Sequence, residues 1–314
     1  MLVPILKAVL PKPLRNALRR RVGALRRFRE GHLSSTEYWT RHHVAAPDEG
    51  FATVAQSLDH LDWRNRQYPG HTDLMPVDTA DGLAVLDYGC GPGNDIVGFG
   101  TFSKPSRLVA LDVSATALDL ARRRAALHGI NAEFHRMAEE RRELPLDDAS
   151  IDLIHSAGVL HHTPDPLAIL REFRRVLKPN GSAQIMVYNR DSLWMHLHVV
   201  YEMRIANRLY RDLSKEEAFA RTTDGEACPI ARCYRPHEFL ALAREAGLEG
   251  EFLGSAVSLF ELMRLPKIYE ALKDPRLDLE SRTFLSNLQF NDKHWPLTNG
   301  CVAGINGYFR LRAV

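Results

Sequence analysis

The 314-residue chain contains only four cysteines, and they are scattered along its length. Cys228 and Cys233 are the closest pair, but the residues between them do not match the two-residue spacing of a zinc knuckle. Elsewhere, no histidine and acidic residues cluster with a spacing that suits metal ligands. We therefore expect reduced thiols, a cytoplasmic location and no bound metal.

The chain also lacks long apolar runs and a strong excess of one charge. No apolar run reaches the roughly 18 residues that a membrane-spanning helix needs, and residues 1–10 lack the pattern of a signal peptide. The net charge is only +2, which argues against a surface that binds nucleic acid throughout. With 45% hydrophobic residues, the chain can form one large folded domain with an added lobe.

Acidic residues are missing from the start of the chain. Lysines and arginines recur there before the first acid, Glu30, and apolar residues follow a roughly helical spacing that Pro11 and Pro13 interrupt. This pattern predicts a basic amphipathic extension over residues 1–30. Such a helix is suited to peripheral contact with an anionic membrane. Alternatively, it packs on the domain and keeps its charges in water.

Strand-like and helix-like patterns alternate beyond residue 82, as they do in parallel α/β sheets. Ser114 is placed to cap the second helix and Gly129 to end it, while Asp165 and Pro166 are typical of a helix start. Further strand patterns close the chain, with insertions at 190–235 and 256–300 between them. The predicted strands cover residues 83–88, 107–112, 132–137, 150–156, 182–188, 249–255 and 304–314.

A glycine-rich loop, DYGCGPG over residues 87–93, directly follows the first predicted strand. Its glycines allow a sharp turn and a close approach of the backbone to a ligand. Asp112 ends the next strand, where a carboxylate can accept hydrogen bonds from two ribose hydroxyls, so the pattern predicts a nucleoside site. A nicotinamide-binding fingerprint would place glycine at position 94, where this chain has Asn94.

Four blocks in this order are similar to successive motifs of the class I S-adenosylmethionine-dependent methyltransferases. They are VLDYGCGPG, LDVS, LPLDDASIDLIHSAGVLHHTPDP and LREFRRVLKPNG, and the match is dense over residues 83–188. The small-molecule subgroup that includes the ubiquinone and menaquinone pathway enzymes is most similar. The resemblance implies an α/β, Rossmann-like seven-stranded methyltransferase sheet with helices on both faces, plus helical C-terminal insertions. It also implies S-adenosyl-L-methionine as the cofactor.

The resemblance further implies cofactor contacts at the strand ends. Asp87 would help to bind the amino group, Asp112 the ribose, and Val113 would pack on the adenine. Many relatives have Asp-Ala after the third strand where this chain has Met137-Ala138, so the contact to the adenine amino group is open, and Glu139 or Glu140 are candidates. The predicted cofactor-binding residues are Tyr38, Asp87, Gly89, Gly91, Gly93, Asn94, Asp112, Val113, Met137 and Ala138.

Two histidines, His161 and His162, follow the fourth strand at the rim of the expected crevice. Histidine suits proton transfer because its ordinary pKa lies near neutrality, so both are candidate general bases. The alternative is that the pair shapes the cofactor pocket. Tyr188 and Asn189, at the end of the fifth strand, are further candidates on the rim.

Two other segments are expected near the ligands. Residues 34–43 resemble the N-terminal segment that folds over the cofactor, with Tyr38 and Trp39 as an aromatic lid, although an ordinary buried helix would show the same pattern. Residues 221–229 are polar and rich in turn formers, and with Arg232 and Tyr234 they could bind a polar or anionic acceptor. A solvated loop is the alternative for that segment.

These observations predict methylation of an oxygen or nitrogen atom in a small polar metabolite, a sugar or a lipid-linked precursor. An RNA methyltransferase that uses the basic and aromatic residues at 63–68, and a non-catalytic cofactor-binding module, are the alternatives. We divide the chain into a basic extension, a cofactor-lid region, a cofactor-binding core and a substrate lobe with the closing strands. Their ranges are 1–30, 31–80, 81–190 and 191–314; the pattern does not indicate an oligomeric state.

Overall fold

The computed structural model describes residue 22 and residues 33–42, 50–138 and 142–313. Apart from Val22, the predicted basic extension over residues 1–30 lies outside the described residues. Glu139 and Glu140, the candidates for the adenine contact, also lie outside them.

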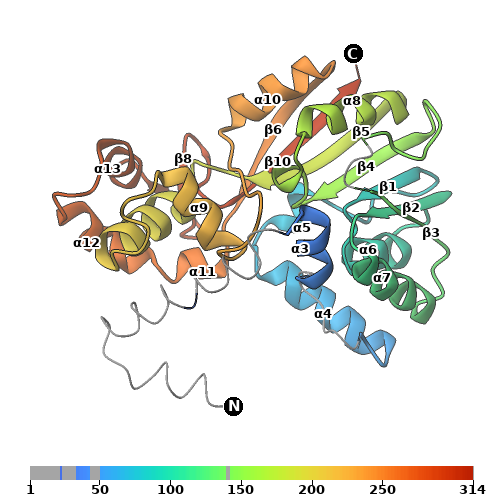
Figure 1. Ribbon diagram of the computed structural model, residues 1–314, viewed down its shortest axis with the longest axis horizontal. Helices are drawn as coiled ribbons and strands as arrows, with labels where there is room; N and C mark the ends of the chain where they lie inside the picture. Colours follow the sequence, from blue (N-terminus) through green and yellow to red (C-terminus); the bar gives the residue numbers. More distant parts are fainter. Residues whose placement is uncertain (1–21, 23–32, 43–49, 139–141, 314) are drawn as a thin grey trace.

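A seven-stranded sheet forms the centre of the molecule, in the order β3-β2-β1-β4-β5-β10-β6 (Figure 1). Strand β10 runs antiparallel to both of its neighbours, whereas the other neighbouring strands are parallel. The predicted seven-stranded, Rossmann-like sheet is therefore confirmed. The strands are β1 (Ala84–Tyr88), β2 (Arg107–Asp112), β3 (Glu133–Arg136), β4 (Ile151–Ala157), β5 (Leu177–Tyr188), β6 (Leu248–Ala256) and β10 (Asn306–Ala313).

The strand order reverses between β1 and β4, which makes this pair the topological switch point of the sheet. Loops that leave the carboxyl ends of two such strands diverge to opposite faces, and the gap between them is where open α/β sheets bind ligands. The glycine loop follows β1, and His161 and His162 follow β4 in the short 3₁₀ helix η1 (Leu160–His162). The topology thus brings the two predicted motifs to the same edge of the sheet.

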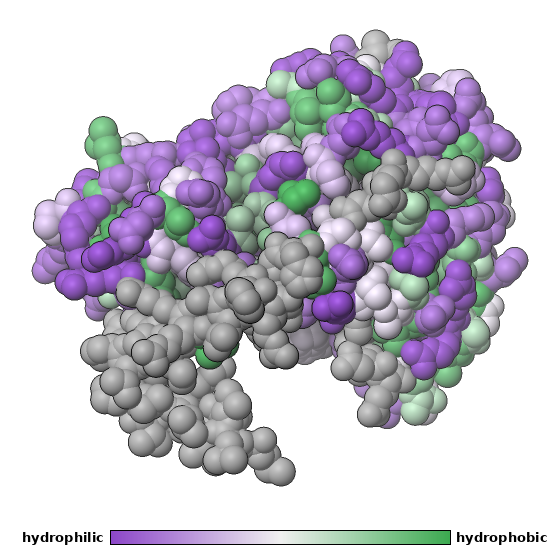
Figure 2. Space-filling model, in the orientation of Figure 1, coloured by the Kyte–Doolittle hydropathy of each residue, from purple (hydrophilic) through white to green (hydrophobic). Residues whose placement is uncertain are grey.

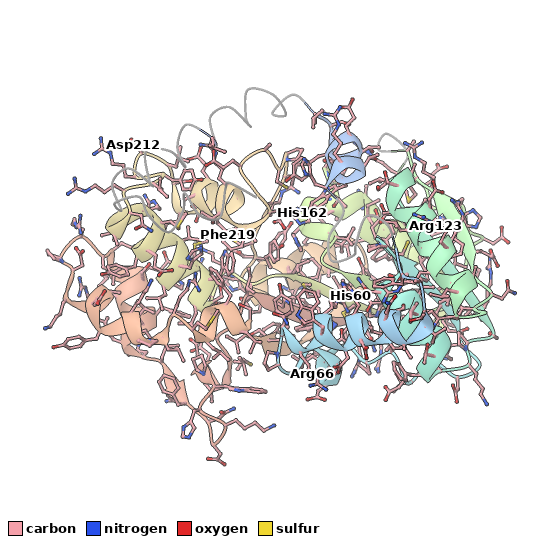
Figure 3. The ribbon with its side chains drawn as sticks, turned by 90° about the horizontal axis from the view of Figure 1, so that it is seen from below. His60, Arg66, Arg123, His162, Asp212 and Phe219 are labelled. Carbon is pink, nitrogen blue, oxygen red and sulfur yellow. The ribbon has the colours of Figure 1, made fainter. Side chains whose placement is uncertain are left out.

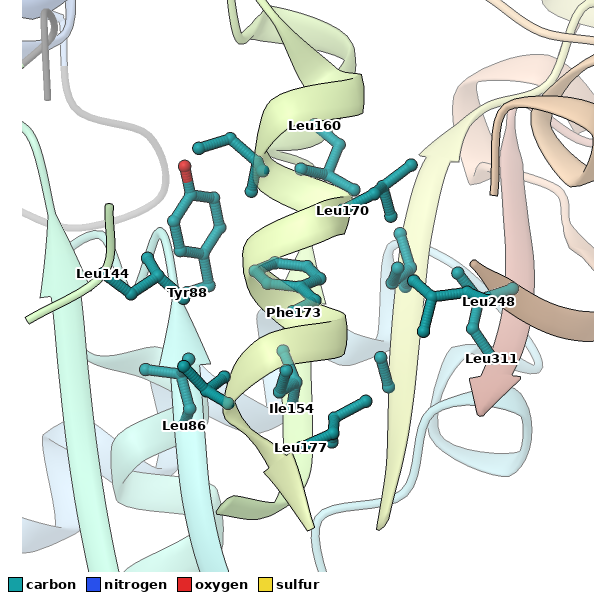
Figure 4. Packing of buried hydrophobic residues seen from close by; sticks show 14 of the residues in the cluster. Leu86, Tyr88, Leu144, Ile154, Leu160, Leu170, Phe173, Leu177, Leu248 and Leu311 are labelled. Carbon is teal, nitrogen blue, oxygen red and sulfur yellow. The ribbon is translucent and has the colours of Figure 1, made fainter. Parts of the chain in front are cut away.

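One face of the sheet is covered by α8 (Pro166–Val176) and α10 (Pro236–Glu245). The side chain of Asp165 accepts a hydrogen bond from the Ala168 N–H and Pro166 occupies the first turn of α8, as predicted from the sequence. Phe173 from α8 is fully buried against Tyr88, with ring centroids 5.1 Å apart (Figure 4). The apolar side of α8 therefore anchors this helix, which follows η1, to the sheet.

The opposite face is covered by α5 (His71–Leu74), α6 (Asn94–Phe102) and α7 (Ala115–Leu127), with α4 (Val54–Arg66) beside them. Ser114 caps α7 by accepting a hydrogen bond from the Ala117 N–H at 3.1 Å. Gly129 follows the helix with a φ of +66°, a conformation that favours glycine. Both predicted ends of this helix are confirmed.

A lobe built from the insertions lies beside the sheet and has its own apolar core (Figure 1). The core is formed mainly by a π-helix, η2, which packs against α9 and α13. The helical elements of the lobe are η2 (Trp194–Ala206), α9 (Lys215–Thr223), α11 (Leu259–Leu262), η3 (Leu265–Lys267), α12 (Ile268–Lys273) and α13 (Leu279–Ser286).

The lobe also contains a small antiparallel sheet that the sequence patterns did not predict. It comprises β7 (Gln289–Phe290), β8 (Pro296–Thr298) and β9 (Cys301–Val302). Asn299 and Gly300 connect β8 to β9 with φ angles of +50° and +78°. A two-residue Asn-Gly loop with both φ angles positive is the geometry that closes a tight hairpin.

Hydrophilic side chains cover most of the visible face of the lobe and of α10, and apolar ones are scattered among them (Figure 2). No helix among the described residues is both long and apolar enough to cross a bilayer.

Candidate active site

The glycine loop after β1 turns through three residues with positive φ: Gly89, Gly91 and Gly93. A Cβ on Gly89 would lie 2.2 Å from a methyl group of Val159, so that position has no room for a side chain. At Gly91, no described atom lies within 4 Å of the place a Cβ would take. The loop therefore presents bare backbone to open space at Gly91, as a bound nucleoside requires.

Asp112, at the end of β2, is tied directly to this loop. Its Oδ2 accepts a hydrogen bond from the Gly91 N–H at 2.8 Å, and its Oδ1 accepts one from the Ser114 N–H at 2.8 Å. Burial raises the pKa of this carboxyl group, while the backbone donors act in the opposite direction. Each oxygen retains a lone pair, so the carboxylate can still accept hydrogen bonds from two ribose hydroxyls.

Asp87, at the end of β1, is 2% exposed, and its Oδ2 accepts no hydrogen bond from any described residue. Burial raises its pKa well above the ordinary value; nearby Asp95 acts in the same direction, and Arg64 opposes both. A buried acceptor without a donor costs about 1–3 kcal/mol. An ammonium group supplies the missing donor and charge, so this carboxylate fits the amino group of the expected cofactor.

Two arginines, the buried Arg124 and the partly buried Arg64, hold the residues that follow the glycine loop. Arg64 from α4 donates to both oxygens of Asp95, at 2.8 and 3.0 Å. Arg124 from α7 donates to Oδ1 of Asn94 at 2.6 Å and to both oxygens of Ser57. The start of α6 is thereby fixed to two other helices. Asn94 has this supporting contact, and its predicted contact with the cofactor stays a prediction.

The residues predicted around the adenine adjoin Asp112. The Met137 N–H donates to the Asp112 carbonyl at 2.9 Å and the Met137 side chain is buried. Val113 is partly buried against the main core, whereas Ala138 is exposed. This arrangement can form one wall of an adenine pocket, and the individual contacts remain predictions.

His161 is completely buried, and its ring packs against that of His162. Its ring is 3.8 Å from the ring of Tyr188 and 4.1 Å from that of His162, measured between centroids. Burial, followed by the neighbouring His162, lowers the pKa of His161 well below its ordinary value. Neither ring nitrogen bonds to a described residue. His161 is therefore a neutral ring that packs against Tyr188.

His162 is held in a defined orientation. Its Nδ1 lies 2.6 Å from the carbonyl oxygen of Ile230, a distance at which Nδ1–H donates. When the ring is neutral, this hydrogen bond leaves the lone pair on Nε2. Nε2 lies 3.7 Å from Oδ2 of Asp224, and the ring centroid is 4.7 Å from that of Trp39. In Figure 3, His162 lies between the lobe helix that carries Phe219 and the N-terminal helix α3 (Ser35–Arg41).

Helix α3 (Ser35–Arg41) connects these parts, and reciprocal hydrogen bonds between Ser34 and Glu37 cap its start. The Tyr38 hydroxyl donates to the Asp224 carbonyl at 2.7 Å, and the Thr116 hydroxyl donates to the Thr40 carbonyl at 2.9 Å. The helix therefore bridges the lobe and α7, beside the glycine loop. This position suits the predicted lid, although Tyr38 contacts the lobe in this structure.

The segment 221–229 reaches the site through Asp224, which sequence patterns alone did not single out for a role. The Tyr188 hydroxyl donates to Oδ1 of Asp224 at 2.8 Å. Burial raises the pKa of Asp224, opposed by His162 and by the Tyr188 hydroxyl. Other predicted rim residues are engaged elsewhere: Arg232 donates to the Thr163 and Pro164 carbonyls, and the Asn189 amide donates to the Asp191 and Gly304 carbonyls.

Cys228 also lies near these groups. One possible metal-ligand atom from each of His162, Asp224 and Cys228 lies within 4.8 Å of the others. Burial and Asp224 raise the pKa of the Cys228 thiol to about 12, so the protonated thiol is favoured. Metal ligation requires the thiolate. The expectation that no metal binds stays a prediction.

Comparisons with known proteins agree with this geometry. Residues 85–181 match a family described as a methyltransferase domain. The chain is 26% identical over 208 residues to a ubiquinone biosynthesis O-methyltransferase of Pseudomonas aeruginosa, covering 62% of this chain and 80% of that protein. It is 38% identical over 125 residues to an uncharacterized protein in transposon TN4556 of Streptomyces fradiae. This match covers only 34% of that protein and 38% of this chain.

A similar solved structure is an S-adenosylmethionine-dependent methyltransferase of Thermotoga maritima, a possible histamine N-methyltransferase. It is 16% identical, has a TM-score of 0.47, and the similarity covers 90% of this chain and all of that one.

The sheet order and the glycine loop with its paired acid define a nucleoside-binding enzyme of the Rossmann-like type. With the family match over residues 85–181, they support a class I S-adenosylmethionine-dependent methyltransferase. Its cofactor is S-adenosyl-L-methionine.

Proposed function

We propose that this methyltransferase modifies an oxygen or nitrogen atom of a small polar molecule and that His162 is its general base. The observation that supports the base is the hydrogen bond from Nδ1 to the Ile230 carbonyl, which leaves the Nε2 lone pair beside Asp224. This nitrogen lies at the carboxyl edge of the sheet, across the switch point from the glycine loop. A small metabolite, a sugar or a lipid-linked precursor fits this proposal.

The cofactor supplies an electrophilic methyl group on a sulfonium. Asp87 would bind its amino group, the backbone at Gly91 would approach its methionine part, and Asp112 would hold its ribose. Correct positioning contributes roughly 7–11 kcal/mol to such a reaction. His162 would accept the proton from the acceptor at Nε2, and the Asp224 carboxylate would stabilise the resulting imidazolium. Trp39, from α3, would keep water away from the reacting atoms.

His161, the other predicted candidate base, has no hydrogen bond to a described residue that orients its ring, whereas the Ile230 carbonyl orients His162. We propose that it acts indirectly by packing between His162 and Tyr188. The division into a core over residues 81–190 and a substrate lobe over 191–314 is part of the same proposal, because β1 to β5 carry the cofactor motifs and the lobe carries Asp224.

The RNA alternative lacks support from the basic cluster at 63–68. Arg64 is paired with Asp95 inside the protein, and Arg66 pairs with Asp62 on its own helix. All four cysteines are among the described residues and are free thiols, which favours the proposed cytoplasmic location. Peripheral contact of residues 1–30 with a membrane remains a proposal that liposome binding before and after their deletion would test.

The function can be tested by incubating the protein with radiolabelled S-adenosylmethionine and a fractionated metabolite extract, then identifying the labelled product. With that acceptor, His162→Gln should lower kcat by about 10²–10⁴ near neutral pH, because that is what a general base contributes. Cofactor affinity, measured by calorimetry, should not change. His128→Gln, at the end of α7, is the matched control. Normal turnover by the His162 variant would refute the assignment of the base.

A further inference from the structure

Asp224 is held by two tyrosines, but one of its oxygens has no donor. Tyr188 donates to Oδ1 and Tyr38 to the backbone carbonyl, so the position of the carboxylate is fixed by β5 and α3. Oδ2 is buried and accepts no hydrogen bond from any described residue. The carboxylate is therefore oriented by its neighbours while one acceptor atom is left unused.

The unused oxygen, Asp224 Oδ2, lies close to Nε2 of His162. With Nδ1–H donating to the Ile230 carbonyl, the neutral ring of His162 presents the lone pair of Nε2, and this nitrogen lies 3.7 Å from Asp224 Oδ2. Two lone pairs at this separation repel each other unless a hydrogen-bond donor lies between or beside them. A single nitrogen or two adjacent oxygens at ordinary hydrogen-bond distance can donate to both atoms.

We infer that Asp224 and His162 together recognise a methyl acceptor with two polar hydrogens at the reacting position, as in a primary amine or a pair of neighbouring hydroxyls. This inference rests on the proposed function and assigns Asp224 as the residue that selects the acceptor. In the reaction, the bond from sulfur to the methyl carbon breaks and a bond from that carbon to the acceptor atom forms. The proton of the acceptor atom passes to His162 Nε2, and Asp224 Oδ2 keeps the second hydrogen bond.

Product release follows from the same geometry. The methylated group has one polar hydrogen fewer, so it cannot donate to both Nε2 and Oδ2. The protonated His162 then pairs with Asp224 directly, which fills the acceptor that the product leaves. The site should therefore bind the unmethylated group more tightly than the methylated one.

The inference can be tested by ligand-observed NMR on the full-length enzyme saturated with S-adenosylhomocysteine. The probes are cyclohexane-1,2-diol against 2-methoxycyclohexanol, and benzylamine against N,N-dimethylbenzylamine. In at least one pair, the uncapped probe should bind about tenfold more tightly, equivalent to about 1.4 kcal/mol. Equal affinities within both pairs, or no binding of any probe, would overturn the inference.

Asp224→Asn should abolish this preference. Its amide oxygen would take the hydrogen bond from Tyr188, and its nitrogen would donate to His162 Nε2, which removes both free acceptors at once. Asp212→Asn, whose side chain is 84% exposed between η2 and α9, is the matched control and should keep the preference. The wild-type comparison decides the question even if the Asp224 variant does not fold.

Two further measurements separate the possible failures. If the folded enzyme does not bind S-adenosylhomocysteine, the cofactor assignment fails, whereas normal binding without probe discrimination refutes only the acceptor inference. Elemental analysis of the purified protein would detect a metal ion held by His162, Asp224 and Cys228. A stoichiometric metal would fill the same two acceptor atoms, and it too would overturn the inference.

Discussion

Gly91→Ala should separate the two demands on the glycine loop, backbone conformation and room for the cofactor. Gly91 has a φ of +52°, and no described atom lies within 4 Å of the position that the new methyl group would take. The variant therefore loses stability only through left-handed strain, about 1–2 kcal/mol. For domains of 150–250 residues each kcal/mol lowers Tm by about 2–4 °C, so a decrease of a few degrees is expected.

Cofactor binding should suffer more than folding. The new methyl group points into the space where we place the methionine part of S-adenosylmethionine. Forcing a methyl group into a filled site costs about 1–3 kcal/mol, so affinity should fall about 5- to 150-fold. Isothermal titration calorimetry with S-adenosylmethionine and S-adenosylhomocysteine measures this loss, and differential scanning calorimetry measures Tm on the same samples.

Gly129→Ala provides a matched control for strain. Gly129 has a φ of +66° and equally open surroundings, but it lies in the turn after α7. Its replacement should lower Tm by a similar amount and leave cofactor affinity unchanged. If Gly91→Ala bound the cofactor as tightly as wild type, or if Gly129→Ala weakened binding as much, the placement of the cofactor against this loop would be wrong.

Two other predictions concern ionisable side chains that pack against the start of α6. Arg64→Met should lower the free energy of unfolding, measured in urea, by about 3–5 kcal/mol because Asp95 loses its bidentate partner. Adding Asp95→Asn removes the unpaired charge and should recover part of that loss. An equal or larger loss in the double variant would contradict the charge argument. His71 should make the protein less stable in acid, since burial, followed by Arg64, lowers its pKa to about 3 in the folded state. Only the unfolded chain gains this proton below pH 6.5, so His71 removes about 1.4 kcal/mol of stability between pH 7.5 and 5.5, and His71→Gln should reduce the measured difference by that amount.

The sheet could be predicted because its signals are local. Each strand from β1 to β5 is a short apolar run bounded by turn or cap residues, and Asp165 with Pro166 marks a helix start that the structure confirms. The small sheet β7-β8-β9 was missed although Asn299-Gly300 is a hairpin signal in the sequence. Its strands span only two or three residues, too few to show an alternating pattern.

The proximity of candidate site residues could be predicted only where they end neighbouring strands of the sheet. The glycine loop and Asp112 lie at the ends of adjacent strands, so sequence order alone brings them together. Arg64 could not be assigned in this way, because its charge suggested a surface role and only packing reveals its pairing with Asp95. Long-range ion pairs leave no periodic pattern in the sequence, and here one of them holds the start of α6, directly after the loop where we place the cofactor.

If Asp224 selects the acceptor, as we propose, the lobe can change the acceptor without disturbing the proposed cofactor site. Its contacts come from β5 through Tyr188, from α3 through Tyr38 and from η1 through His162. The glycine loop is instead tied to Asp112, and α4 and α7 hold the start of α6 that follows it. Because no hydrogen bond among the residues described joins Asp224 directly to the glycine loop or to Asp112, substitutions at Asp224 should alter acceptor preference and leave cofactor affinity intact. A change in the affinity for S-adenosylhomocysteine in Asp224→Asn comparable to that in Gly91→Ala would show instead that the two sites are energetically coupled.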